Sequence, residues 1–110
     1  MFFEEAVTEH AVWSVADDQG QPAPINGDGR RSMPFWSKES RAARVIEQVV
    51  AYRDFRLVRI DLDVWKERWL PGLATDRLLV GLNWSGDRAT GFDIEPEEAE
   101  RNLAAAEARA

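Results

Sequence analysis

The sequence contains no cysteine and only one histidine, His10, among its 110 residues. Without cysteine the chain can form no disulfide, offer no thiolate to a metal ion and use no cysteine nucleophile. No orienting acid or nucleophile elbow accompanies His10 and the serines Ser14 and Ser37, so we expect an exposed histidine between a helix and a strand. These absences predict a protein that is not an enzyme and holds no metal or cofactor.

Long apolar runs are also missing from the chain. No stretch of about 18 apolar residues occurs, and the first residues lack the basic and apolar segments of a signal peptide. We therefore expect a cytoplasmic protein without a membrane partner. A length of 110 residues is typical of one domain and allows a buried core, so residues 1–110 are predicted to form a single domain.

Positive charge is absent from the first part of the chain. Residues 1–29 contain six acidic residues and no Lys or Arg, whereas residues 30–59 contain eight basic and three acidic residues. The net charge of -6 disfavours nucleic-acid binding, which depends on neutralising phosphates. The basic segment leaves two alternatives open. The charged blocks neutralise one another in the fold, or the basic residues bind a small anion or an acidic partner.

Apolar segments separated by turn residues predict the strands of a sheet. The patterns indicate strands at 11–16, 31–35, 55–62, 78–84 and 90–94, and a short edge strand at 21–25 that contains two prolines. Turns are expected at 17–20, 26–29 and 85–87. Gly81, inside the most apolar of these strands, indicates close approach by an aromatic ring or by another backbone segment.

Helical periodicity and capping residues predict three to four helices. They are expected at 2–8, at 38–52 with Ser37 as the N-cap, around Trp65 and Trp69, and from Pro96 onward. Pro71 and Gly72 are expected to stop the third helix and reverse the chain. The predicted fold is α+β, with a mostly antiparallel or mixed sheet of about five to six strands packed by these helices.

Aromatic and basic side chains supply the candidate contact residues. Trp65 and Trp69 are neighbours on one helical face, which predicts core packing. Three other tryptophans lie at strand ends or beside turns, where packing and contact with a partner both remain open. Arginines on the exposed face of the 38–52 helix and in the following strand are the better anion candidates, against a solvated face. The possible contacts are Trp13, Trp36, Arg41, Arg44, Arg56 and Trp84.

Two other polar segments are better explained as turns. Asp17, Asp18 and Asp28 lack the spacing and the final glutamate of a calcium loop, so we interpret them as turn residues. The glycine-rich segment at 27–31 lacks the lysine, hydroxyl and spacing of a phosphate-binding loop, which favours a hairpin turn. Neither segment predicts a metal or nucleotide site.

Five short motifs in a fixed order resemble a known family. They are Met33-Pro34-Phe35-Trp36-Ser37, Trp69-Leu70-Pro71-Gly72-Leu73, Asp76, Val80-Gly81-Leu82-Asn83 and the proline that begins the last helix. With an early Val-Trp strand, they resemble the bacterial domain of unknown function 2750 over nearly the whole chain. Arg77 departs from the pattern, which usually has glycine after the aspartate. The proline-aromatic-x-serine helix start is more loosely similar to the N-terminal domain of SseB-type proteins. Neither resemblance implies an activity, a cofactor or a catalytic residue.

The sequence therefore predicts a module that binds without catalysis. The leading hypothesis is a cytoplasmic module that binds another protein or a second copy of itself. In one version it is an immunity-type protein that neutralises a toxin, since such proteins are often small and acidic. The alternative is a regulatory domain that binds a small anionic ligand through Arg41, Arg44 and Arg56 of the basic segment.

Overall fold

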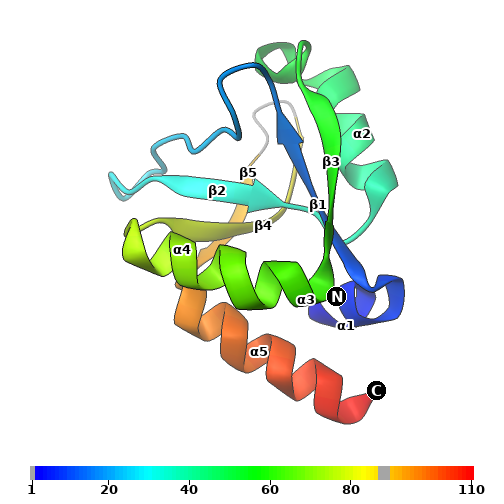
Figure 1. Cartoon of the computed structure of the whole chain (residues 1–110). Coiled ribbons are helices and arrows are strands. Elements are labelled where there is room, and N and C mark those ends of the chain that lie inside the picture. The colour runs from blue at the N-terminus through cyan, green and yellow to red at the C-terminus, as the bar shows by residue number, and fades with distance from the viewer. Residues whose placement is uncertain (1, 87–89) are drawn as a thin grey trace.

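The strands of the protein form two small sheets surrounded by helices (Figure 1). The computed structural model describes residues 2–86 and 90–110. In the first sheet β1 (Ala11–Ala16) pairs antiparallel with β3 (Arg56–Asp61). In the second, β4 (Leu79–Ser85) lies between a parallel β2 (Ser32–Phe35) and an antiparallel β5 (Thr90–Ile94). The α+β class and the mixed pairing are confirmed, and the strands are divided between two sheets.

One pair of residues joins the two sheets. Trp13 in β1 and Trp36, just after β2, exchange both backbone hydrogen bonds, each with an N–O distance of 2.8 Å. All six residues of β1 are buried, because the strand is covered on both faces. Successive side chains of a strand point to opposite faces, so Val12 and Val15 contribute to different apolar clusters.

Helices cover these sheets. α1 (Phe2–Glu9) and α5 (Pro96–Arg109) lie side by side, and α2 (Glu39–Gln48) packs against β1 and β3 on the other side (Figure 1). A further helix runs across β2 and β4, from residue 62 to residue 75. Within residues 2–86 and 90–110, no helix has both the length and the apolar character that a membrane crossing requires.

The helix at 62–75 continues through Pro71, so the expected stop and reversal at Pro71 and Gly72 is wrong. It consists of α3 (Leu62–Val64), a π-helical segment η2 (Trp65–Trp69) and α4 (Leu70–Thr75). In the π segment the Leu70 N–H donates to the carbonyl of Trp65, five residues earlier. Pro71, which has no N–H to donate within the helix, comes directly after this π segment. The widened turn therefore accommodates the proline.

The chain reverses after Asp76 instead, with Arg77 in the left-handed conformation at φ 59°. The Leu78 N–H donates to the Leu73 carbonyl at 2.9 Å, and the Arg77 N–H donates to the Ala74 carbonyl at 3.1 Å. These two bonds define a Schellman motif, which usually has glycine at the left-handed position. The tight turn after Asp76 therefore forms even though Arg77 stands where the family pattern has glycine.

Two further local predictions are corrected. Ser37 does not cap α2, because Lys38 occupies the N-cap position and the Ser37 hydroxyl bonds elsewhere. The helix ends at Gln48, and a short 3-10 helix, η1 (Val50–Tyr52), follows. Instead of forming a strand, the 21–25 segment makes an isolated bridge between Ile25 and Arg31 across the predicted turn at 26–29, and the Pro24 carbonyl accepts the Ser32 N–H at 3.0 Å. Asp87, in the predicted 85–87 turn, lies outside the described residues.

The predicted close approach at Gly81 is confirmed. A β-carbon at this position would lie 2.5 Å from Cε2 of Trp84, so the indole ring occupies the space above the glycine. Gly91 on β5 is nearly as close, since its β-carbon would lie 2.9 Å from Cδ1 of the same ring. The two glycines thus allow the Trp84 ring to pack closely against the β4–β5 pair, where it is buried.

Candidate functional site

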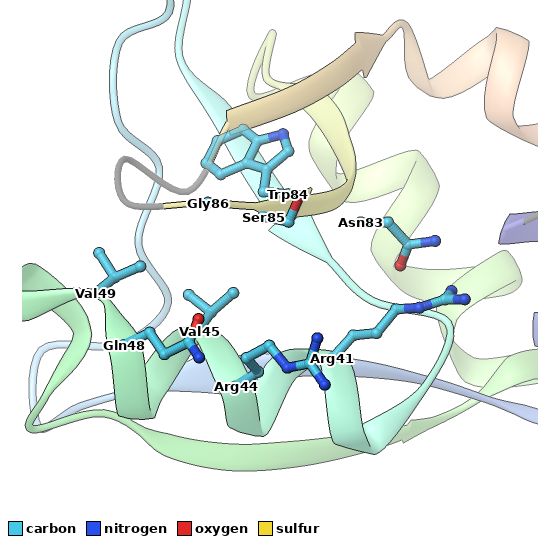
Figure 2. Close-up of a pocket in the computed structure, with 9 residues that line it drawn as sticks. All are labelled: Arg41, Arg44, Val45, Gln48, Val49, Asn83, Trp84, Ser85 and Gly86. Atoms are coloured by element: carbon cyan, nitrogen blue, oxygen red, sulfur yellow. The ribbon is translucent and has the colours of Figure 1, made fainter.

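The α2–β4 pocket is a hollow of about 200 Å³ between the second helix and the central strand (Figure 2). Helix α2 contributes four side chains, and the end of β4 forms the opposite wall. Its lining residues are Arg41, Arg44, Val45, Gln48, Val49, Asn83, Trp84, Ser85 and Gly86. Two guanidinium groups, two side-chain amides and a hydroxyl therefore surround an apolar floor.

Arg41 is held in place by a carboxylate from α1. Its guanidinium donates to both carboxylate oxygens of Glu5, with an Nη2–Oε2 distance of 3.1 Å, and Nη1 also donates to the Ser37 hydroxyl at 3.0 Å. The Ser37 hydroxyl in turn donates to Glu5 Oε1 at 2.7 Å. A bidentate ion pair of this kind fixes the orientation of the guanidinium and the position of its charge.

The same contacts shift the acidity of Glu5. Hydrogen bonds from Arg41 lower the pKa of Glu5 from 4.5 to about 2; partial burial opposes this change, and the Ser37 hydroxyl adds to it. The Glu5 side chain is 23% exposed, so water does not fully screen the pair. Glu5 therefore stays ionised at neutral pH and is too weak a base to accept a proton in catalysis.

Asn83 connects this cluster to β4. Its Oδ1 accepts the Ser37 backbone N–H at 3.0 Å, and its Nδ2 donates to the Ser37 hydroxyl at 3.0 Å. Asn83 adopts φ 51°, and the β4–β5 pairing shifts register between Leu82 and Ser85. Asparagine tolerates this left-handed conformation better than most residues. The bulge thus aims the Asn83 amide at the helix start and the pocket.

Arg44 differs from Arg41 because no carboxylate holds it. Within residues 2–86 and 90–110, Arg44 forms no ion pair, and its side chain is exposed along the pocket. Arg41 and Arg44 are three residues apart on α2, so both reach the same side of the helix (Figure 2). The pocket therefore contains one fixed cation and one with free hydrogen-bonding capacity.

The apolar floor is rigid. Val45 and Val49 are buried on the inner face of α2, next to Trp84. The Trp84 indole Nε1 donates to Asp93 Oδ1 at 3.1 Å, and the Trp84 carbonyl accepts a 2.8 Å bond from Trp36 Nε1. Buried indole groups with satisfied N–H groups pack in one orientation. Packing and hydrogen bonds thus hold the floor in place.

The predicted contact residues separate into two groups. Arg41, Arg44 and Trp84 meet at the α2–β4 pocket, whereas Trp13 and Trp36 do not line it. The side chains of Trp13, Trp36 and Trp84 are only 8%, 0% and 5% exposed, which fits the packing alternative.

Two other residues singled out in the sequence lie outside the pocket. Arg56 begins β3, with Nη1 3.8 Å from Asp18 Oδ1, and both side chains are exposed. His10 is exposed in the turn between α1 and β1, as expected. The basic segment is therefore not one continuous site.

Several residues of the site escaped sequence reasoning. Glu5, Gln48 and Ser85 carry no motif, and Ser37 was interpreted as a helix cap. Asparagine within an apolar strand was the available signal for Asn83, since it favours left-handed backbone there. In the described part of the chain, no group of three or more His, Cys, Asp or Glu side chains is placed to hold a metal ion.

A comparison of the sequence with models of protein families identifies the family of the chain. The family model described as "Protein of unknown function (DUF2750)" matches residues 1–103. The chain belongs to the DUF2750 family. The matched region includes every residue of the α2–β4 pocket and the Glu5 and Ser37 that support it. No curated protein matches the sequence of this DUF2750 chain. The looser similarity to SseB-type domains stays a prediction.

Proposed function

We propose that this DUF2750 protein is a binding module whose α2–β4 pocket takes a small anionic ligand. The observation that carries the proposal is the pair of arginines on one side of α2, of which Arg41 is fixed by Glu5 while Arg44 has no ion-pair partner among the described residues. A guanidinium fork matches the geometry of a carboxylate or phosphate. Gln48 and Asn83 add amide donors at the rim.

The proposal is for binding without catalysis. Guanidinium groups stay protonated in proteins, and side-chain amides do not exchange protons during a reaction. Among the described residues that line the pocket, none is a histidine, an acid, a lysine or a tyrosine. The nearest acid, Glu5, is committed to Arg41 and has a pKa lowered to about 2, so it is a poor general base. A sensor or carrier of a small anion is the function that these groups suit.

Calorimetric titration with acetate, butanoate and inorganic phosphate tests the proposal. We expect at least one of these anions to bind and Arg44→Gln to weaken its binding by roughly ten-fold or more, because a charge-assisted pair is lost. Arg56→Gln is the matched control, since it removes the same charge from the same basic segment outside the pocket. The control should leave the affinity within about two-fold of wild type.

Two results would overturn the anion site. If none of the three anions binds, the pocket is not an anion site. An equal loss in Arg44→Gln and Arg56→Gln would show that only the overall positive charge matters and that the pocket does not.

Protein binding is a second candidate because of an exposed apolar groove elsewhere. The Val50 groove is an open hollow of about 780 Å³, in which Tyr52 and Phe55 stack with ring centroids 5.3 Å apart. Val50 is 75% exposed at its edge. Its lining residues are Pro22, Ala23, Pro24, Arg31, Gln48, Val49, Val50, Ala51, Tyr52 and Phe55. An apolar side chain of a polypeptide partner, such as the toxin of an immunity-type pair, suits this surface.

Site-specific photo-crosslinking in native lysate tests this second candidate. A photoreactive residue at Val50 should capture one defined partner or a second copy, and Arg31→Glu at the groove should reduce the capture. Val64 on α3, 39% exposed, is the control position and should capture nothing. Equal capture from both positions, or none from either, would exclude the groove as an interface.

A further inference from the structure

A second hollow shares Asn83 with the α2–β4 pocket. The Phe92 hollow has a volume of about 400 Å³ and is almost entirely apolar around its base. Phe92 on β5 is 80% exposed at its rim, the largest exposed fraction among the large apolar side chains that the structure describes. The lining residues are Phe2, Phe3, Leu82, Asn83, Ser85, Gly91 and Phe92.

The two hollows adjoin through the bulged end of β4. Asn83 and Ser85 line both of them, so one wall separates a cationic pocket from an apolar one. The register shift between Leu82 and Ser85 falls at this point, and Gly91 on the paired strand β5 also lines the apolar hollow. A molecule bound beside Arg44 would therefore have to pass Asn83 to reach Phe92.

We infer that the ligand is an acyl carboxylate whose head group binds Arg44 and whose apolar chain crosses Asn83 into the Phe92 hollow. This inference rests on the proposed anion site, which supplies the head-group contacts. The hollow has room for roughly a dozen water-sized groups at roughly 30 Å³ each, and so for a chain of roughly six to ten carbons with part of the space left to solvent. An exposed phenylalanine beside a cationic pocket suits an amphiphilic molecule better than a fully polar anion.

The dependence of affinity on the length of the ligand's acyl chain tests the size of the Phe92 hollow. In calorimetric titrations with unbranched carboxylates from acetate to decanoate, below their micelle concentrations, each added methylene should raise the affinity about three- to four-fold. The rise should stop once the hollow is filled, near eight to ten carbons by the same rough volume argument. Octanol, which has the chain without the charge, should bind at least roughly ten-fold more weakly than octanoate.

Two variants separate the head-group contacts from the chain contacts. Phe92→Ser should leave the affinity for acetate unchanged and flatten the dependence on chain length, because Phe92 lines only the apolar hollow. Arg44→Gln should weaken all carboxylates by a similar factor and keep the chain-length slope. A nitroxide attached to the end of the octanoate chain should broaden the NMR signals of Phe3 and Phe92, which checks the path without any substitution.

The outcomes distinguish this inference from the proposed function. Carboxylates that bind with one affinity at every chain length overturn the acyl ligand and leave the anion site standing. Octanol that binds as tightly as octanoate overturns the anion site. No binding at any length overturns both. Broadening confined to residues of α2 would overturn the path across Asn83.

Discussion

Single side chains of this protein link elements that are distant in the sequence. Ser37 is the clearest case, because its hydroxyl donates to Glu5 and accepts hydrogen bonds from Arg41 and Asn83. The residue is fully buried, and all of its polar capacity is used. One serine thus ties α1, α2 and β4 together, and its position at a helix start concealed that role in the sequence.

Glu5→Gln should lower the free energy of unfolding by about 1 kcal/mol at pH 7, since it removes the charge that Arg41 faces. The pKa of Glu5 is lower in the folded state, about 2, than its ordinary value of 4.5. Its stabilisation is therefore present above pH 4.5 and is lost as the pH falls toward 2. Urea midpoints of both proteins between pH 2 and pH 7 should converge in acid.

Glu9→Gln is the control for this prediction, because Glu9 lies on the same helix and only approaches Lys38 at 3.9 Å. It should change stability by less than about 0.5 kcal/mol. A wild-type advantage over Glu5→Gln that persists at pH 2 would contradict the role of the ion pair.

Gly81→Ala should destabilise the protein by about 2–3 kcal/mol, because the new methyl group would lie 2.5 Å from the Trp84 ring. Chemical denaturation measures the loss, and tryptophan fluorescence should report the displaced ring. Gly72→Ala is the matched control, since nothing lies within 4 Å of its β-carbon and the residue is helical. It should instead stabilise the protein by about 0.5–1 kcal/mol. A stabilised Gly81→Ala protein would refute the close packing of Trp84.

At the scale of elements, the helix at 62–75 shows how packing overrides local signals. Pro71 and Gly72 both disfavour a continuous helix, yet the helix extends across them and buries Trp65, Leu70 and Leu73 in the core. The π turn at 65–69 provides the adjustment that makes this possible. Burial of these side chains outweighs the local cost, which residue propensities alone do not reveal.

The end of this helix yields a prediction about Arg77. Arg77→Gly should raise the free energy of unfolding by about 0.5–1 kcal/mol, because a left-handed residue with a side chain is strained. The gain is reduced by the greater freedom of glycine in the unfolded chain. Arg77→Ala keeps the strain and loses the charge, so it should differ from wild type by less than about 0.5 kcal/mol. Urea titration compares the three proteins, and equal midpoints for the glycine and alanine variants would contradict the strain.

At the scale of the whole molecule, β1 lies between two apolar clusters and contributes side chains to both. Trp13, Trp36 and Trp84 belong to one cluster, whereas Trp65 and Trp69 pack in the other. The backbone pair between Trp13 and Trp36 joins the two sheets at this strand. We therefore expect the clusters to unfold together although they are covered by different helices.

Fluorine NMR with 5-fluorotryptophan checks this cooperativity, since the five tryptophans report on both clusters without a substitution. All five folded signals should disappear with the same urea midpoint, which should also match the midpoint from circular dichroism. Earlier loss of the Trp65 and Trp69 signals would show that the second cluster unfolds separately.

The sequence by itself determined the elements and their class. Apolar segments, turn residues and the proline that begins the last helix located β1, β4, β5, α1 and α5, because these signals lie within each segment. The Gly81 contact was also predictable, since a glycine inside an apolar strand calls for a close neighbour. Arg41 and Arg44 were recognised as candidates from their place on a helix face.

Only the tertiary structure decided what those residues face. Glu5 reaches Arg41 from 36 positions away, and the β4 bulge at Asn83 brings the pocket and the Phe92 hollow together. Local patterns carry no information about such distant contacts. They depend on how the two sheets join, which Trp13 and Trp36 fix through backbone hydrogen bonds. The candidate site therefore arises from the packing of separate segments, because no single motif contains its charges and its apolar walls.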